Sequence, residues 1–111
     1  VAYIHLIDTV NFGYHQKCPV VSLADFRSVY KGILIGNGGY TAEAAEEAIA
    51  SGNADFIAFG RPFISNPDLV ERFANNWPLT TADMSTFYTH DHIGYTDYPF
   101  YQPTTDSAVV A

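Results

Sequence analysis

The sequence predicts an α/β fold built on a parallel sheet, and three observations support this prediction. Short apolar runs alternate with helix-like patterns along the 111 residues. Each run is apolar throughout, which is typical of strands covered on both faces. Turn-forming residues follow the runs. Strand–helix alternation of this kind occurs in doubly wound open sheets and in (β/α)₈ barrels, and both architectures remain open on this pattern alone.

The first strand is expected within residues 1–8, an apolar run that ends at a polar residue, Asp8. His5 lies in this run and is expected to be a core histidine. Residues 9–19 contain turn formers and are expected to form a loop. A helix is expected within residues 20–30, because one side of it collects apolar side chains: Leu23, Phe26 and Tyr30.

The second strand is expected at residues 32–36, and it leads into a turn that contains Gly38 and Gly39. Thr41 is predicted to cap the next helix. Gly52 is predicted to stop that helix. Its apolar face is expected to consist of Ala42, Ala45 and Ile49.

The third strand is expected at residues 55–59, ended by the run Gly60-Arg61-Pro62. Another helix is expected to start at Asn66, with Asn66 as its cap and Pro67 as its first helical residue. Its apolar face would hold Leu69, Phe73 and Trp77, and Pro78 would end it. From Leu79 onward the chain is rich in aromatic and polar residues, and residues 102–111 are expected to form a loose tail.

Composition excludes several classes of protein. The net charge is −7 with five Lys and Arg, so a nucleic-acid binder or a protein that docks on anionic membranes is not expected. No apolar run approaches the roughly 20 residues that span a bilayer, and no secretory signal is evident. The single cysteine, Cys18, allows no internal disulfide and fits a cytoplasmic location. The chain begins at Val1 within an expected strand, which suggests a missing N-terminal part.

The chemically informative feature is a pair of turns that follow successive strands. Gly38 and Gly39 follow the second strand, and Gly60 and Arg61 follow the third. In parallel β/α units both turns lie at the carboxyl ends of the strands, where binding sites form. Glycine lets backbone N–H groups approach an anion closely, and an arginine side chain matches phosphate oxygens. Either turn alone could be an ordinary turn, but the two together predict a phosphate site. The first turn does not match the GxGxxG dinucleotide fingerprint.

Four segments resemble the C-terminal region of Old Yellow Enzyme family flavoproteins, which include N-ethylmaleimide reductases and 12-oxophytodienoate reductases. They are Gly36–Thr41, Phe59–Phe73, Thr86–Tyr88 and Gly94–Pro99. The resemblance covers residues 1–101. It implies that the chain holds about strands six to eight of a TIM (β/α)₈ barrel.

The resemblance also implies FMN as the cofactor and NADPH as the reductant of an α,β-unsaturated carbonyl compound. It places Gly38, Gly39, Gly60 and Arg61 at the FMN phosphate, and Phe87 and Tyr88 beside the flavin and substrate. The family's substrate-orienting His pair and its proton-donating Tyr belong to earlier strands, so no residue of this chain is assigned as catalytic.

Two further classes of function remain open: another phosphate-binding barrel enzyme, such as an aldolase or isomerase, and a truncated non-catalytic remnant. The first would need a catalytic Lys or acid at a strand end, and neither Lys17 nor Lys31 occupies such a position. His90-Asp91-His92 is expected to be a solvated loop and not a metal site. Three parallel strands would leave two edges unpaired, so the chain is expected to need the missing barrel part or self-association for stability.

Overall fold

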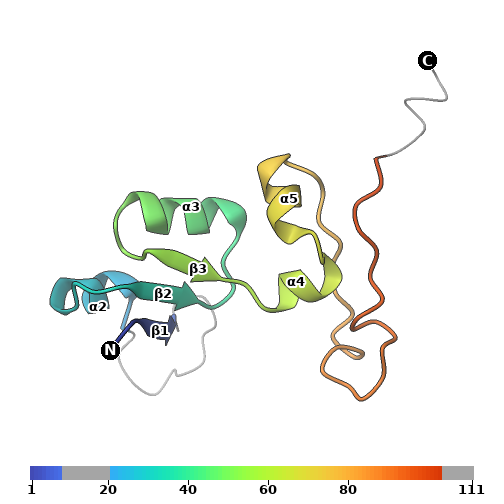
Figure 1. The fold of residues 1–111 in the computed structure, drawn as a ribbon, viewed down its shortest axis with the longest axis horizontal. Coiled ribbons are helices and arrows are strands. Elements are labelled where there is room, and N and C mark those ends of the chain that lie inside the picture. Colours follow the sequence, from blue (N-terminus) through green and yellow to red (C-terminus); the bar gives the residue numbers. More distant parts are fainter. Residues whose placement is uncertain (9–20, 104–111) are drawn as a thin grey trace. The chain divides into compact units, whose positions relative to one another are not determined.

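The computed structural model describes residues 1–8 and 21–103 (Figure 1). It divides into two compact units, Val1–Phe59 and Gly60–Ala111, which are referred to below as unit 1 and unit 2. The expectations for residues 9–19, for Cys18 and for most of the tail lie outside the described residues. Among the described residues, no helix is both long and apolar enough to cross a membrane.

Unit 1 alternates strands and helices as the sequence predicts. The elements in chain order are β1 (Ile4–Ile7), α2 (Leu23–Val29), β2 (Leu34–Asn37), α3 (Ala42–Ala50) and β3 (Phe56–Ala58). The three strands form a parallel sheet in the order β1-β2-β3. The predicted parallel sheet is therefore confirmed for this unit, with strands shorter than the apolar runs.

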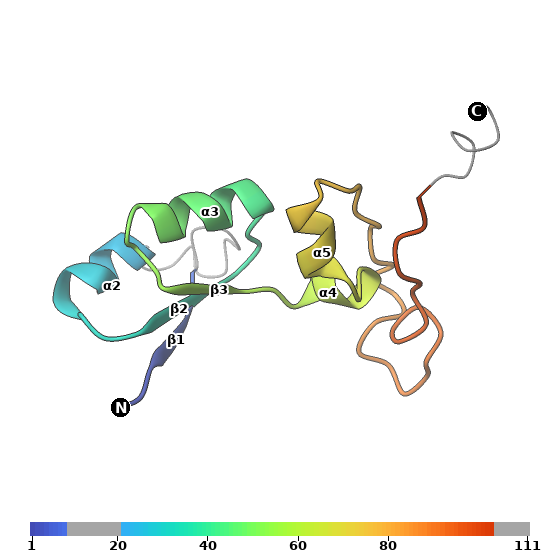
Figure 2. The ribbon, with the colours of Figure 1, turned by 45° about the horizontal axis from the view of Figure 1, so that its top comes forward.

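One face of this sheet carries the core. Leu23 of α2 and Leu34 of β2 are buried together with Ala54, and Phe26, Tyr30 and Ala48 pack against this cluster. Figure 2 shows α2 and α3 on the same side of the sheet. The expected apolar side of α2 is thus confirmed. In α3 the packing residues include Ala45 and Ala48, whereas the predicted face residue Ile49 is 45% exposed.

The opposite face of the sheet is open, which corrects the expectation that both faces are covered. The register aligns His5 of β1 with Ile35 of β2 and Phe56 of β3 in one row across this face. Phe56 is 58% exposed, and His5 is exposed as well. His5 is therefore not a core histidine in this structure, because no element among the described residues of unit 1 covers its side of the sheet.

Both helices of unit 1 begin at hydroxyl caps. The Ser22 side chain accepts from the Asp25 N–H, and Asp25 in turn accepts from the Ser22 N–H, which forms a complete capping box. Thr41 caps α3 as predicted, since its hydroxyl accepts from the Ala44 N–H at 3.1 Å. These local signals fix where each helix starts after its loop.

Unit 2 begins with two short helices, α4 (Arg61–Ser65) and α5 (Leu69–Ala74). The sequence pattern does not predict α4, and α5 starts later than the predicted residue, Asn66. Asn66 follows α4, and Asp68 is the residue that precedes α5. The helix also ends earlier than predicted, at Ala74 and not at Pro78, because Asn76 adopts a φ of 55°.

A buried arginine organises unit 2. Arg72 is 3% exposed and donates from Nε to Asp68 Oδ1 at 2.7 Å. One terminal nitrogen, Nη1, donates to Asn66 Oδ1 at 2.7 Å, and the other, Nη2, donates to the carbonyl of Pro99 at 3.2 Å. Asp68 also accepts from the Tyr101 N–H at 2.8 Å. These contacts connect α5 and its cap residue with residues 27 and 33 positions further along the chain.

The rest of unit 2 that the structure describes, residues 79–103, contains neither helix nor strand. Its aromatic side chains nevertheless make defined contacts. Trp77 stacks on Tyr101 with ring centroids 4.6 Å apart. The change of composition after Leu79 thus coincides with the end of regular secondary structure in the described part of unit 2.

Candidate phosphate and flavin site

The first candidate element is the glycine turn at the carboxyl edge of the sheet in unit 1. β2 and β3 are neighbours, and Asn37 at the end of β2 pairs with Ala58 at the end of β3. Gly38 and Gly39 come directly after β2 with φ values of 130° and 68°. Side-chain-bearing residues rarely adopt such backbone conformations, so glycine is required for this turn. The turn can present backbone N–H groups to an anion.

Two hydrogen bonds to one residue bracket this turn. The Asp8 N–H donates to the carbonyl of Asn37 at 2.7 Å, just before the glycines. The Tyr40 hydroxyl, just after them, donates to Asp8 Oδ2 at 2.6 Å. Burial of Tyr40, and then the hydrogen bond to the Asp8 carboxylate and its charge, raise the pKa of the phenol well above its usual value. Tyr40 therefore remains a donor throughout the physiological range.

The second candidate element lies at the start of unit 2. Gly60 precedes α4, and no side chain caps this helix. Arg61 is the first helical residue and is exposed, with its guanidinium carbon 5.6 Å from the centroid of the Phe87 ring. This spacing is within the range of a cation–π contact. The Arg61 side chain, which is predicted to bind a phosphate, thus packs against the ring of Phe87.

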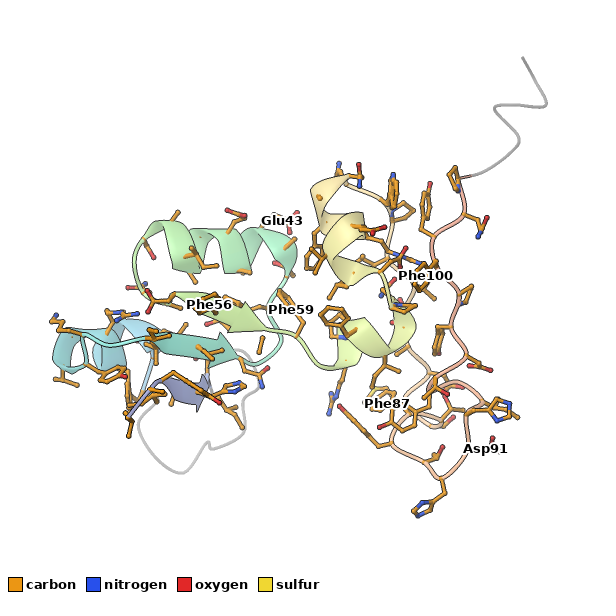
Figure 3. The ribbon with its side chains drawn as sticks, in the orientation of Figure 1. Glu43, Phe56, Phe59, Phe87, Asp91 and Phe100 are labelled. Atoms are coloured by element: carbon orange, nitrogen blue, oxygen red, sulfur yellow. The ribbon has the colours of Figure 1, made fainter. Side chains whose placement is uncertain are left out.

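Phe87, which Figure 3 labels, and its neighbour Tyr88 form an aromatic corner in unit 2. Phe87 is buried, Tyr88 is exposed, and their rings meet edge to face with centroids 5.0 Å apart. Tyr88 has a φ of 62°, which is unusual for a bulky residue. A methyl group added at Gly60 would lie 3.8 Å from the Tyr88 hydroxyl. Unit 2 therefore brings together four predicted site residues: Gly60, Arg61, Phe87 and Tyr88.

The segment His90-Asp91-His92 is an exposed loop, as the sequence predicts. His92 Nδ1 lies 2.9 Å from Asp91 Oδ1, and both side chains are more than half exposed. Within residues 1–8 and 21–103, no three His, Cys, Asp or Glu side chains are grouped as metal ligands.

Sequence reasoning missed the contact between Asp8 and Tyr40. Asp8 was noted as the polar end of a strand, and Tyr40 was noted as part of a motif. A polar residue at the end of one strand and a tyrosine after the next strand's turn lie at the same sheet edge, and this signal could have paired them.

Residues 1–80 match the model of the family described as the NADH:flavin oxidoreductase / NADH oxidase family. The chain belongs to this family. The family is one of FMN oxidoreductases, which agrees with the FMN cofactor and the nicotinamide reductant that the sequence motifs imply. The resemblance drawn from the sequence motifs is thereby confirmed at the level of the family.

Individual relatives agree with this assignment. The chain is 55% identical over 110 residues to 12-oxophytodienoate reductase 7 of Oryza sativa subsp. japonica, an alignment that covers 90% of this chain and 28% of that protein. It is 41% identical to the old yellow enzyme from Trypanosoma cruzi, with a TM-score of 0.78 over 90% of this chain and 26% of the solved one. A structure of morphinone reductase in complex with tetrahydroNAD gives a TM-score of 0.74 at 41% identity, covering 90% of this chain and 26% of that one.

The chain thus spans about a third or less of the length of the curated relatives it matches. Its fold corresponds to a fragment of the Old Yellow Enzyme TIM barrel, here with a three-stranded parallel sheet.

Proposed function

We propose that this chain is the FMN-phosphate-binding part of an ene-reductase, which uses NAD(P)H to reduce the C=C bond of α,β-unsaturated carbonyl compounds. In this proposal the chain supplies about strands six to eight of the barrel. The observation that carries it is the placement of a positive-φ glycine turn after β2 and of Gly60-Arg61 after β3, in a chain of the FMN oxidoreductase family.

The proposed roles of the turn residues follow from their chemistry. Gly38 and Gly39 would donate backbone N–H groups to the phosphate, as would Gly60 and Arg61. The exposed Arg61 guanidinium would add charge-assisted hydrogen bonds to the phosphate oxygens. These residues fit a phosphate group for two reasons. Gly38 and Gly39 adopt positive φ and carry no side chain that would block an anion, and α4 starts without a side-chain cap.

The aromatic corner is proposed to contribute to the substrate side of the site. Tyr88 presents 62% of its surface and has a hydroxyl that can donate a hydrogen bond. Phe87 holds both the Tyr88 ring and the Arg61 side chain in place through ring contacts. A small unsaturated carbonyl compound could pack against such a wall.

Hydride transfer would be supplied by the bound flavin, with the protein providing orientation and electrostatics. None of this chain's residues is proposed as catalytic, and the chain alone is expected to be inactive. An aldolase or isomerase is disfavoured by the family match and because Lys31 precedes β2, at the amino edge of the sheet. The cytoplasm remains the proposed compartment.

The phosphate assignment is tested by comparing FMN with riboflavin, which lacks the phosphate. Binding of both flavins to the chain would be followed by the quenching of flavin fluorescence. We expect the chain to prefer FMN, and Arg61→Ala to weaken FMN binding about 10- to 100-fold, as expected for the loss of a hydrogen bond to a charged group. Riboflavin binding should not change.

Arg27→Ala is the matched control. Arg27 donates to the Gly32 carbonyl and pairs with Asp55, which precede β2 and β3 at the amino edge of the sheet. This variant should retain the FMN preference. Equal affinity of the unaltered chain for the two flavins, or an Arg61→Ala chain that still prefers FMN as strongly, would contradict the proposal.

The activity is tested by co-expressing the chain with the N-terminal part of the rice 12-oxophytodienoate reductase that it does not match. We expect NADPH-dependent reduction of a simple enone only when both parts are present. A complemented protein that is soluble and carries bound flavin but does not reduce the enone with NADPH would contradict the ene-reductase assignment.

A further inference from the structure

The glycine turn of unit 1 poses a physical problem for a phosphate site. Glycine loses more conformational freedom on folding than any other residue, and here two glycines stand in sequence. A turn that binds an anion through its N–H groups must hold them within about 0.5 Å of the productive geometry. Something other than the glycines themselves must therefore restrict this turn.

Asp8 and Tyr40 provide that restriction from both sides. Asp8 is 5% exposed and bonds through its N–H to Asn37 and through its carboxylate to Tyr40. Asn37 and Tyr40 are the residues immediately before and after the glycine pair. Asp8 therefore holds both ends of a short loop, Asn37 and Tyr40, and Gly38 and Gly39 are the two residues between these ends.

The chemistry of this contact is suited to a fixed geometry. A hydroxyl-to-carboxylate hydrogen bond of 2.6 Å belongs to the short, charge-assisted class, which is about twice as strong as a neutral one. Burial strengthens it further, because water does not compete for the carboxylate. Tyr40 also packs against the core cluster of unit 1, so its ring is held independently of the hydroxyl.

We propose that the Asp8–Tyr40 pair is a positioning device that holds the Gly38–Gly39 turn in the conformation that binds a phosphate monoester. This inference rests on the proposed function. Neither residue needs to touch the phosphate, and both act through the backbone of the turn. The pair thus determines affinity for flavins that carry a phosphate and not affinity for the flavin ring.

The test uses Tyr40→Phe, which removes the hydroxyl and keeps the ring. It is made in the chain co-expressed with the N-terminal reductase part described above, because the chain alone is expected to associate. Two quantities are measured: the ¹⁵N order parameters of the Gly38 and Gly39 amides, and the ratio of FMN affinity to riboflavin affinity. We expect the order parameters to fall from about 0.85 toward 0.6. We expect the affinity ratio to fall about tenfold, with riboflavin binding unchanged, as for the loss of one charge-assisted hydrogen bond.

Tyr30→Phe is the matched control, because Tyr30 packs against the same core cluster but follows α2 at the amino edge of the sheet. It should leave both quantities unchanged. Asp8→Asn gives a second route to the same result. The effects of Asp8→Asn and Tyr40→Phe should not add in the double variant, because both act on the same hydrogen bond: Asp8→Asn weakens it by removing the charge of the acceptor, and Tyr40→Phe removes it.

The outcomes separate the two proposals. If the unaltered chain shows no preference for FMN over riboflavin, the proposed function fails. If it shows the preference and Tyr40→Phe retains both the preference and rigid glycine amides, only the positioning role is overturned. A variant that weakens FMN and riboflavin equally also overturns it, because that result indicates a general loss of structure.

Discussion

Arg72 carries a charge into the interior of unit 2, and its partners explain how the charge is tolerated. Burial acts to raise the pKa of Asp68, but the hydrogen bonds from Tyr101 and Arg72 prevail and hold that pKa below its usual value. The carboxylate is therefore charged at neutral pH and compensates the guanidinium. Because the pKa is lowered in the folded chain, this stabilisation is present at pH values above about 4 and is lost as the pH falls through the lowered pKa.

The first prediction concerns this side chain. Arg72→Met should lower the free energy of unfolding of unit 2 by about 3–5 kcal/mol, because removing one partner leaves a buried, uncompensated carboxylate. The fluorescence of Trp77, the single tryptophan of the chain, should report the change, since Trp77 stacks on Tyr101. The measurement is the urea midpoint of this fluorescence.

Arg27→Met is the matched control for that measurement. The Arg27–Asp55 pair is partly exposed, with 18% and 46% of the two side chains accessible. Pairs of this kind contribute at most about 1 kcal/mol. An Arg72→Met midpoint that moves no further than the Arg27→Met midpoint would show that the buried contacts of Arg72 are dispensable.

At the scale of elements, the approach of α2 to the sheet depends on a glycine inside a strand. A methyl group at Gly36 would lie 2.8 Å from Leu23 Cδ1 and 3.0 Å from Ile57 Cδ1. Both distances are shorter than normal carbon contacts, so the helix or the side chains would have to move. Overpacking of this kind typically costs about 1–3 kcal/mol.

The second prediction is that Gly36→Ala destabilises unit 1 by that amount, read as a lower urea midpoint in far-UV circular dichroism. Adding Leu23→Val should recover part of the loss, because it removes one carbon where the new methyl group needs room. If the double variant is less stable by the full sum of the two single effects, the steric explanation is wrong.

The elements that sequence reasoning located are those whose signals are local. The apolar runs located the three strands, and Thr41 marked the start of α3, since a cap acts on N–H groups three residues away. The glycine turn was located in the same way. Its conformation, with positive φ at both residues, follows from the residue type.

The errors occurred where distant residues decide the local structure. Asn66 has the sequence pattern of a helix cap, but its side chain is buried and bonded to Thr80, fourteen residues away. Pro62 is consistent with the end of a strand, but proline is also favoured in the first turn of a helix, which is where it lies in α4. Of the candidate site, the glycines and Arg61 could be named from sequence, whereas the Asp8–Tyr40 contact needed the sheet register.

At the scale of the whole molecule, the sheet of unit 1 is covered by helices on one face only among the described residues. Its helices cover the face that holds Leu34, and the two outer strands, β1 and β3, each have an edge that pairs with no other strand among the residues that the structure describes. The open face and its margins expose large apolar side chains, each between 47% and 58% accessible: Tyr3, Ile7, Ile33 and Phe56. Surfaces of this kind are normally covered by another part of a protein.

The last prediction follows from that face. The 111-residue chain, expressed alone, should sediment as associated species at micromolar concentration, because unpaired parallel edges and exposed apolar side chains favour contacts between copies. Replacing Ile7 and Phe56 with Thr should shift the distribution toward monomer, whereas the same replacement at the exposed Val70 of α5 in unit 2 should not. A monomer with a sharp, concentration-independent melting transition would contradict this prediction, since it would mean that the helix-covered face alone provides enough buried surface to hold the fold.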